Sequence, residues 1–227
     1  MLDRMLRSLR SARACRGLTA LTAALVGASL VAGCGAGPDP IAFQNRTFYA
    51  YMFNGNIDAS EFEKPWKPWD YAAQPGLPEY KGVAVLDAHV HVSRPVNWVI
   101  RDANDAPGSR YIEYVSPNEY VFALYELPYP SNDLWRDVMN RYEQDAKDAG
   151  ATFVGSRVPM ATYNAQGRGY IVKRGVAAAK APFVSMSREY ILRGEKRLIL
   201  VQVVHQGETL KPISDELYRV ITSIEVL

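Results

Sequence analysis

Leu198-Ile199-Leu200-Val201-Gln202-Val203-Val204-His205 is the stretch that constrains the fold most strongly. Side chains alternate between the two faces of an extended strand. The apolar residues of this stretch divide between both faces: Leu198, Leu200 and Val204 on one, and Ile199, Val201 and Val203 on the other. A strand that is apolar on both faces is covered on both sides. We therefore expect it at the centre of a sheet, with packed layers above and below.

Segments on both sides of this stretch have the patterns of further strands and of two helices. Alternating, β-branched and aromatic-rich runs predict strands over 83–92, 110–116, 120–127, 152–160, 169–180 and 183–192. Apolar residues at helical spacing predict helices over 133–149 and from about Asp215 to Ile224. Hairpin connections dominate, which indicates antiparallel pairing. We expect one α+β domain over 83–227, in which a mostly antiparallel sheet packs with helices.

The residues before this domain, 41–82, form an arm that is rich in aromatic residues and proline. It holds ten aromatic residues, and four prolines between 65 and 78 break any helix or central strand. Trp66, Trp69 and Tyr71 are the candidate binding residues, because aromatic side chains dominate many binding surfaces. The sequence favours the other interpretation, an arm that wraps the domain and buries these rings, since exposed apolar patches are rare on monomers.

Residues 1–33 have the layout of a secretory signal: five arginines, an uncharged run over 17–31, and small residues after it. The run has fifteen residues, whereas a transmembrane helix needs about 20. Val31-Ala32-Gly33-Cys34 resembles the lipobox of bacterial lipoproteins. That resemblance implies cleavage before Cys34, lipidation of this cysteine and a short tether over 34–40. A plain cleaved signal is the alternative reading.

The lipobox resemblance also implies a location. Lipoproteins of that family carry several acyl chains, and two or more chains anchor a protein stably. Gly35 follows the cysteine, and Ala36 follows Gly35. Neither is the aspartate that retains many such proteins in the inner membrane of Gram-negative bacteria. We expect a protein tethered to the membrane through Cys34, in the outer membrane and facing the periplasm.

Charge and cysteine content narrow the possible functions. The chain carries 26 basic and 24 acidic side chains, of which residues 1–33 hold five and one. The remaining 194 residues therefore have 21 basic and 23 acidic side chains, a net charge of −2. This balance gives no electrostatic support for binding nucleic acid. Cys34 is the one cysteine of this part, so it cannot form an internal disulfide.

The order of predicted elements from about Pro95 to Leu227 is similar to that of the PsbP-like fold. The resemblance rests on the opening Trp98, a penultimate hydrophobic hairpin and a C-terminal helix. That family includes photosystem accessory subunits, a Ran-binding nuclear-import factor and small bacterial lipoproteins. Its members are mainly binding or assembly factors, so the resemblance implies a non-catalytic protein.

One local motif points instead to metal chemistry. Asp87, His89 and His91 resemble the Asp-x-His-x-His motif on the first strand of amidohydrolases. On the strand predicted over 83–92, these side chains would share one face. A catalytic metal usually needs at least three protein ligands, and His205 is the only other histidine. The amidohydrolase barrel is also much larger, typically about 250 residues.

The sequence thus favours a non-enzymatic envelope lipoprotein that binds an envelope protein or a cell-wall partner, without a cofactor. A metal-dependent hydrolase using Asp87, His89 and His91 is one alternative. The other is a sensor that binds a small ligand between the sheet and a helix.

Overall fold

The computed structural model describes residues 57–71, 74–118, 120–128, 135–176, 183–206 and 209–227. The lipobox, the tether and the first part of the arm, up to residue 56, lie outside these ranges.

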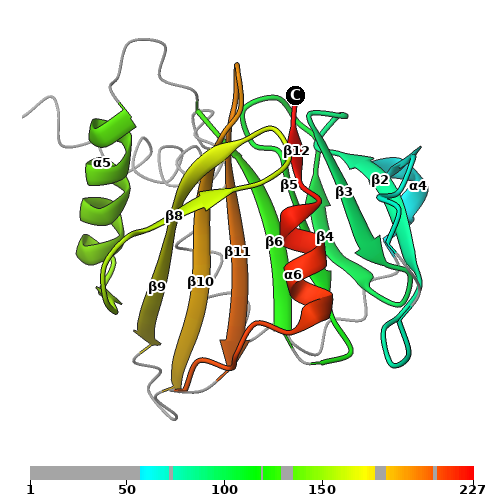
Figure 1. The fold of residues 1–227 in the computed structure, drawn as a ribbon. Helices are drawn as coiled ribbons and strands as arrows, with labels where there is room; N and C mark the ends of the chain where they lie inside the picture. Colours follow the sequence, from blue (N-terminus) through cyan, green and yellow to red (C-terminus); the bar gives the residue numbers. More distant parts are fainter. Residues whose placement is uncertain (1–56, 72–73, 119, 129–134, 177–182, 207–208) are drawn as a thin grey trace, which may run out of the picture. The chain divides into compact units, whose positions relative to one another are not determined.

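The described residues form two antiparallel sheets (Figure 1). The larger sheet has the strand order β4-β5-β6-β11-β10-β9-β7, and β8 also pairs with β9. Its strands are β4 Val99–Asn104, β5 Tyr111–Val115, β6 Tyr120–Leu127, β7 Ala151–Phe153, β8 Val158–Ala161, β9 Gln166–Val176, β10 Phe183–Arg193 and β11 Leu198–Gln206. All of these pairings are antiparallel, which confirms the predicted sheet type.

Strand β11 lies in the middle of the larger sheet, between β6 and β10, as the sequence predicts. Leu200 and Val201 point to opposite faces, and both are fully buried. Leu200 packs with Leu198 and Val204 in one apolar cluster, and Val201 packs with Ile199 and Val203 in another. The two clusters therefore lie on opposite faces of the sheet, which explains why this strand is apolar on both.

Helices take part in both clusters. Helix α5, Trp135–Asp148, contributes Met139 and Ala146 to the cluster of Leu200. Helix α6, Asp215–Thr222, contributes Leu217, Val220 and Ile221 to the cluster of Val201. Ser214 caps α6, because its hydroxyl accepts a hydrogen bond from the amide of Leu217 at 3.2 Å. Both helices fall within the predicted ranges, although residues 133 and 134 lie outside the described chain.

The smaller sheet has the order β1-β2-β3-β12, and its side chains join α6 in the cluster of Val201. Its strands are β1 Lys64–Trp66, β2 Tyr80–Val85, β3 Val90–Pro95 and β12 Glu225–Val226, and a short helix, α4 Ala59–Phe62, precedes β1. Strand β2 runs across positions 82 and 83, where the sequence analysis divided the arm from the domain. The second half of the arm is thus built into this sheet.

The single strand predicted over 83–92 is wrong, because a turn divides it into β2 and β3. Leu86, Asp87 and Ala88 have φ values of 55°, 56° and 63°. Three successive residues in the left-handed region reverse the chain. The turn contains no glycine or proline, and Leu86 is buried like a strand residue. The alternating pattern therefore continues through the turn and hides it.

The strand predicted over 152–160 is also wrong as one element. It is divided into β7 and β8, and Gly155 between them has a φ of +80°. Glycine adopts this conformation without steric cost, so it allows the chain to change direction there. The strand predicted over 169–180 corresponds to β9, and residues 177–180 are outside the described ranges.

Candidate binding pocket between the arm and helix α6

A buried carboxylate in the described part of the arm fixes its position. Glu63 accepts hydrogen bonds from Arg94 Nε at 2.5 Å and Arg94 Nη2 at 2.9 Å. Lys81 Nζ lies 2.7 Å from the same carboxylate, and the Tyr114 hydroxyl donates to it at 2.9 Å. Burial alone would raise the pKa of Glu63, but Arg94 and Lys81 lower it below its ordinary value. Glu63 thus stays ionised and holds this part of the arm against both sheets.

The next residues of the arm pair with strand β2, and the backbone of the arm lies very close to Gly82. Lys64, Pro65 and Trp66 form β1, which pairs with Ala84, Val83 and Gly82 of β2. A Cβ atom at Gly82 would lie 2.5 Å from the carbonyl oxygen of Trp66 and 2.5 Å from the nitrogen of Pro68. Glycine is therefore required at position 82 for the arm to pass.

After β1, the arm forms hydrogen bonds to β3 and to the last turn of α6. The amide of Trp69 donates to Ser93 Oγ at 2.9 Å, and its indole Nε1 donates to the carbonyl of Ser223 at 3.0 Å. The Tyr71 hydroxyl donates to the carbonyl of Arg219 at 2.7 Å. The polar ends of Trp69 and Tyr71 are thus used inside the protein, and the Trp69 ring also packs edge-to-face with Tyr163, with centroids 4.7 Å apart.

These contacts enclose a pocket of about 410 Å³, which is within the usual size range of ligand sites. It is lined by Pro68, Trp69, Asp70, Tyr71, Gln74, Leu77, Pro78, Glu79, Tyr80 and Arg219. The ring centroids of Tyr71 and Tyr80 are 5.4 Å apart. The Arg219 guanidinium carbon lies 5.1 Å from the Tyr71 centroid and 6.0 Å from that of Tyr80, within the range of cation–π contacts.

The pocket combines neutral aromatic rings with charged groups. Burial raises the pKa of Tyr71 above its ordinary value. Burial and the nearby Glu216 carboxylate raise the pKa of Tyr80 to about 12, so its phenol is neutral at physiological pH. Asp70 and Glu79 supply exposed carboxylates, against the one guanidinium of Arg219. The pocket therefore suits an apolar ligand surface that carries a basic group.

The candidate binding residues Trp66, Trp69 and Tyr71 do not all lie in one site. Trp69 and Tyr71 line the pocket, whereas Trp66 does not. Trp66 stacks on His91, with ring centroids 3.6 Å apart, and remains 46% exposed. Sequence reasoning missed Tyr80 and Arg219, which come from a strand and a helix far apart along the chain. No local pattern brings these two residues together with the arm.

The motif Asp87, His89 and His91 does not have the predicted geometry, because the turn after β2 separates its members. His89 Nδ1 is 3.1 Å from a carboxylate oxygen of Glu126, whereas His91 Nδ1 is 3.4 Å from one of Glu225. Asp87 contacts the guanidinium of Arg110 at 3.1 Å. Each member therefore has its own partner. Within the described ranges, no group of three or more His, Cys, Asp or Glu side chains could hold a metal ion.

Comparisons with known proteins find similar solved structures but no related sequence. No known protein family matches the sequence, and no curated protein matches it either. The fold is similar to the solution structure of PsbP (CyanoP) from the cyanobacterium Synechocystis sp. PCC 6803, with a TM-score of 0.48 and 12% identity. The match covers 70% of this chain and 99% of CyanoP. Among the helices of the described chain, none is long and apolar enough to cross a membrane.

Proposed function

We propose that this chain is an envelope lipoprotein that presents a non-catalytic binding module at the membrane surface. In this proposal, lipid on Cys34 anchors the protein in the outer membrane, and residues 34–40 tether the domain on the periplasmic side. The signal layout and the Val31-Ala32-Gly33-Cys34 sequence support this part. The pocket between the arm and α6 receives the partner.

The observation that carries the proposal is how the arm uses its aromatic side chains. Trp69 Nε1 and the Tyr71 hydroxyl bond to backbone carbonyls at the end of α6, and the Tyr80 hydroxyl lies 3.4 Å from the carbonyl of Glu216. The rings are thus oriented by the protein itself, before any partner binds. Rings held in this way lose little conformational entropy on binding, which favours affinity.

The chemistry of the lining supports an extended, proline-containing segment of an envelope protein as the partner. Grooves lined by aromatic residues bind such segments, because a polyproline-type helix is already extended and loses little entropy. Pro68, Leu77 and Pro78 add apolar surface beside the rings. Asp70 and Glu79 favour a basic residue in the bound segment.

Site-specific photo-crosslinking in intact cells tests this proposal. A photoreactive amino acid replaces Gln74, which is exposed and lines the pocket. We expect a crosslinked protein, identified by mass spectrometry at a proline-containing segment. A second change, Leu77→Ser, should reduce the product about tenfold or more, because a side chain at the centre of an interface can contribute 2 kcal/mol or more.

Val99→Ser is the matched control for the second change. Val99 is an aliphatic residue of β4 that is 62% exposed and lies outside the pocket lining. This variant should leave the crosslinked product unchanged. A product that Leu77→Ser does not reduce would contradict the proposal, and crosslinks to glycan strands would assign the pocket to the cell wall instead.

Fractionation of a Cys34→Ser variant tests the anchor separately. The lipobox resemblance implies that this cysteine is the lipid attachment point, so its loss should release the protein from membranes. The measurement is the distribution of the protein between washed membranes and the soluble periplasmic fraction. Normal membrane retention of Cys34→Ser would refute the lipoprotein assignment and leave the pocket proposal standing.

A further inference from the structure

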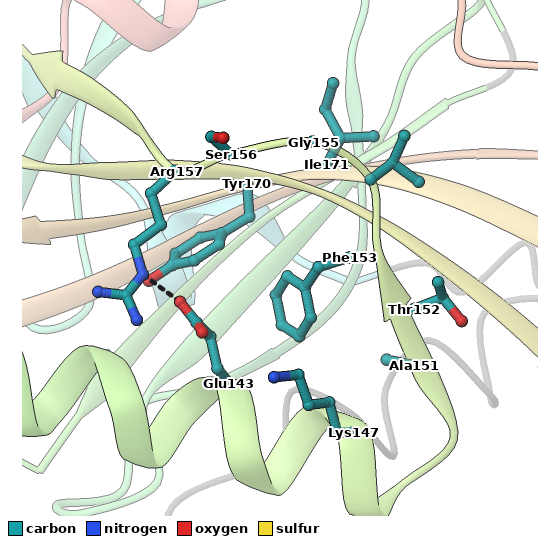
Figure 2. A pocket seen from close by; sticks show the side chains of 11 residues that line it. Glu143, Lys147, Ala151, Thr152, Phe153, Gly155, Ser156, Arg157, Tyr170 and Ile171 are labelled. Carbon is teal, nitrogen blue, oxygen red and sulfur yellow. Dashed lines mark hydrogen bonds and ion pairs between the residues drawn. The ribbon is translucent and has the colours of Figure 1, made fainter.

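A second, larger cavity lies on the opposite side of the larger sheet, where α5 faces strands β7 and β9 (Figure 2). Its volume is about 780 Å³, again within the usual range of small-molecule sites. It is lined by Glu143, Lys147, Ala151, Thr152, Phe153, Val154, Gly155, Ser156, Arg157, Tyr170 and Ile171. None of these residues takes part in the pocket of the arm.

Aromatic rings form the base of the cavity. The centroids of Phe153 and Tyr170 are 5.4 Å apart in an edge-to-face arrangement, and Tyr142 of α5 lies 5.6 Å from Tyr170. Lys147 extends from α5 over the Phe153 ring, with its Nζ 5.9 Å from the centroid. The cavity thus offers a flat apolar surface with a cation at its edge (Figure 2).

The charges of the cavity sum to a single positive charge. The guanidinium of Arg157 forms an ion pair with the Glu143 carboxylate, and its Nη2 donates to Asn140 Oδ1 at 2.9 Å. These two charges offset one another, whereas Lys147, one helical turn after Glu143, forms no ion pair among the described residues. An anion beside Lys147 would be attracted, and solvent screens part of this attraction because Lys147 is exposed.

Tyr170 adds an unused hydrogen-bond donor. This residue is 5% exposed, and its hydroxyl makes no hydrogen bond to the described residues. Burial and the neighbouring Glu143 charge raise its pKa well above the ordinary value, so the hydroxyl keeps its proton. A buried donor without an acceptor is unfavourable, and a bound acceptor would satisfy it. Figure 2 shows the Tyr170 side chain pointing toward the Arg157–Glu143 ion pair, with Phe153 between it and Lys147.

We infer that this cavity binds a small organic anion with a flat apolar body, such as an aromatic carboxylate. The body lies against Phe153, Lys147 attracts the anionic group, and the Tyr170 hydroxyl donates to a ligand oxygen. This site is independent of the partner pocket of the arm and would give the protein a second, small-molecule ligand.

Titration with 2-naphthoate tests the inference, using the full-length protein in detergent. Its affinity is measured by calorimetry and its position by amide chemical-shift changes. We expect shifts in residues 152–157, and weaker binding of the neutral analogue 2-naphthamide. Lys147→Gln and Tyr170→Phe should each weaken 2-naphthoate binding about tenfold, as expected for the loss of a hydrogen bond to a charged group.

Arg136→Gln is the matched control, because it removes a positive charge from α5 outside the cavity lining. It should leave the affinity for 2-naphthoate unchanged. Equal binding of acid and amide, or no effect of Lys147→Gln, would overturn the inference. Shifts confined to residues 68–80, or no binding at about 1 mM, would overturn it as well. None of these outcomes affects the crosslinking test of the arm.

Discussion

Glu63 and Glu113 are two buried carboxylates in different parts of the molecule, and their pKa values move in opposite directions. Glu63, in the arm just before β1, has its pKa lowered, whereas burial raises the pKa of Glu113 in strand β5 to about 7. Each faces one arginine and accepts a hydrogen bond from one tyrosine hydroxyl. The two carboxylates therefore have similar kinds of partner, although their pKa values shift in opposite directions.

The opposite pKa shifts follow from the number of cations beside each carboxylate and from how much solvent each carboxylate still contacts. Glu63 has both Arg94 and Lys81, and it is 7% exposed. Glu113 has Arg101 as its cation, and it is fully buried beside the acidic Asp102, which raises its pKa further. One arginine does not offset complete desolvation, whereas two cations offset partial desolvation. Of these two carboxylates, the one that stays charged is therefore the one with two cations.

The position of Glu63 gives this difference a functional meaning. Its partners Lys81, Arg94 and Tyr114 come from β2, β3 and β5, so the carboxylate connects the arm to both sheets. The pocket residues Trp69 and Tyr71 follow a few positions later. An ionised Glu63 therefore fixes the arm just before its pocket residues.

Arg94→Met should give the largest effect of the changes considered. Arg94 is 3% exposed and supplies two hydrogen bonds to Glu63. Removing one partner of a buried ion pair typically costs about 3–5 kcal/mol, because the other charge stays buried without support. We expect a loss of this size in the free energy of unfolding, measured by urea denaturation.

Arg136→Met is the control for this change, because it removes an exposed arginine from α5. A change within about 0.5 kcal/mol is expected there, as for ordinary surface substitutions. A similarly small loss in Arg94→Met would mean that Glu63 does not depend on its arginine, and the comparison with Glu113 would fail.

A structural feature could be predicted from the sequence where the residues that form it lie within one short segment. Strand β11 and helix α6 were predictable, because their burial patterns lie within one short segment each. The turn at Leu86, Asp87 and Ala88 was not, since left-handed backbone there carries no glycine signal. Because of this turn, the predicted single strand is a hairpin, and Asp87, His89 and His91 do not share one strand face.

The candidate site was predictable only in part, for the same reason. Trp69 and Tyr71 could be chosen as unusual residues of the arm. Arg219 is an ordinary helix residue in the sequence, and it becomes part of the pocket only because the arm ends on α6. The β12 pairing that brings the C-terminus to β3 likewise involves two residues, too few for a recognisable pattern.

The pH dependence of stability should differ in sign between the two carboxylates. The folded pKa of Glu113 is raised from 4.5 to about 7, so its unfavourable contribution is absent below pH 4.5 and grows as the pH rises to about 7. At 1.36 kcal/mol per pKa unit, it should lower the free energy of unfolding by about 3 kcal/mol over this window. Glu113→Gln should abolish that decline, measured by urea denaturation from pH 4 to 8.

Glu63 should show the opposite sign in the same experiment. Its folded pKa is lowered, so its stabilising contribution is present above pH 4.5 and is lost as the pH falls through the folded pKa. Glu63→Gln should therefore flatten the acid side of the profile and leave the decline toward pH 7 in place. Identical profiles for the two variants would show that the carboxylates do not differ as described.

Lys81→Met should have the smallest effect on stability and the most direct effect on the comparison. The Lys81 side chain is 40% exposed, so its bond to Glu63 is partly screened by solvent. We expect a loss of about 1–2 kcal/mol in the free energy of unfolding, at the lower end for a hydrogen bond to a charged group.

Without Lys81, Glu63 keeps one arginine and one tyrosine, which is the set of partners that Glu113 has. Its pKa should then rise above the wild-type value, toward the behaviour of Glu113. Carboxyl ¹³C chemical shifts followed through a pH titration would measure this directly. An unchanged pKa of Glu63 in Lys81→Met would assign the difference between the two carboxylates to the fuller burial of Glu113 rather than to the second cation.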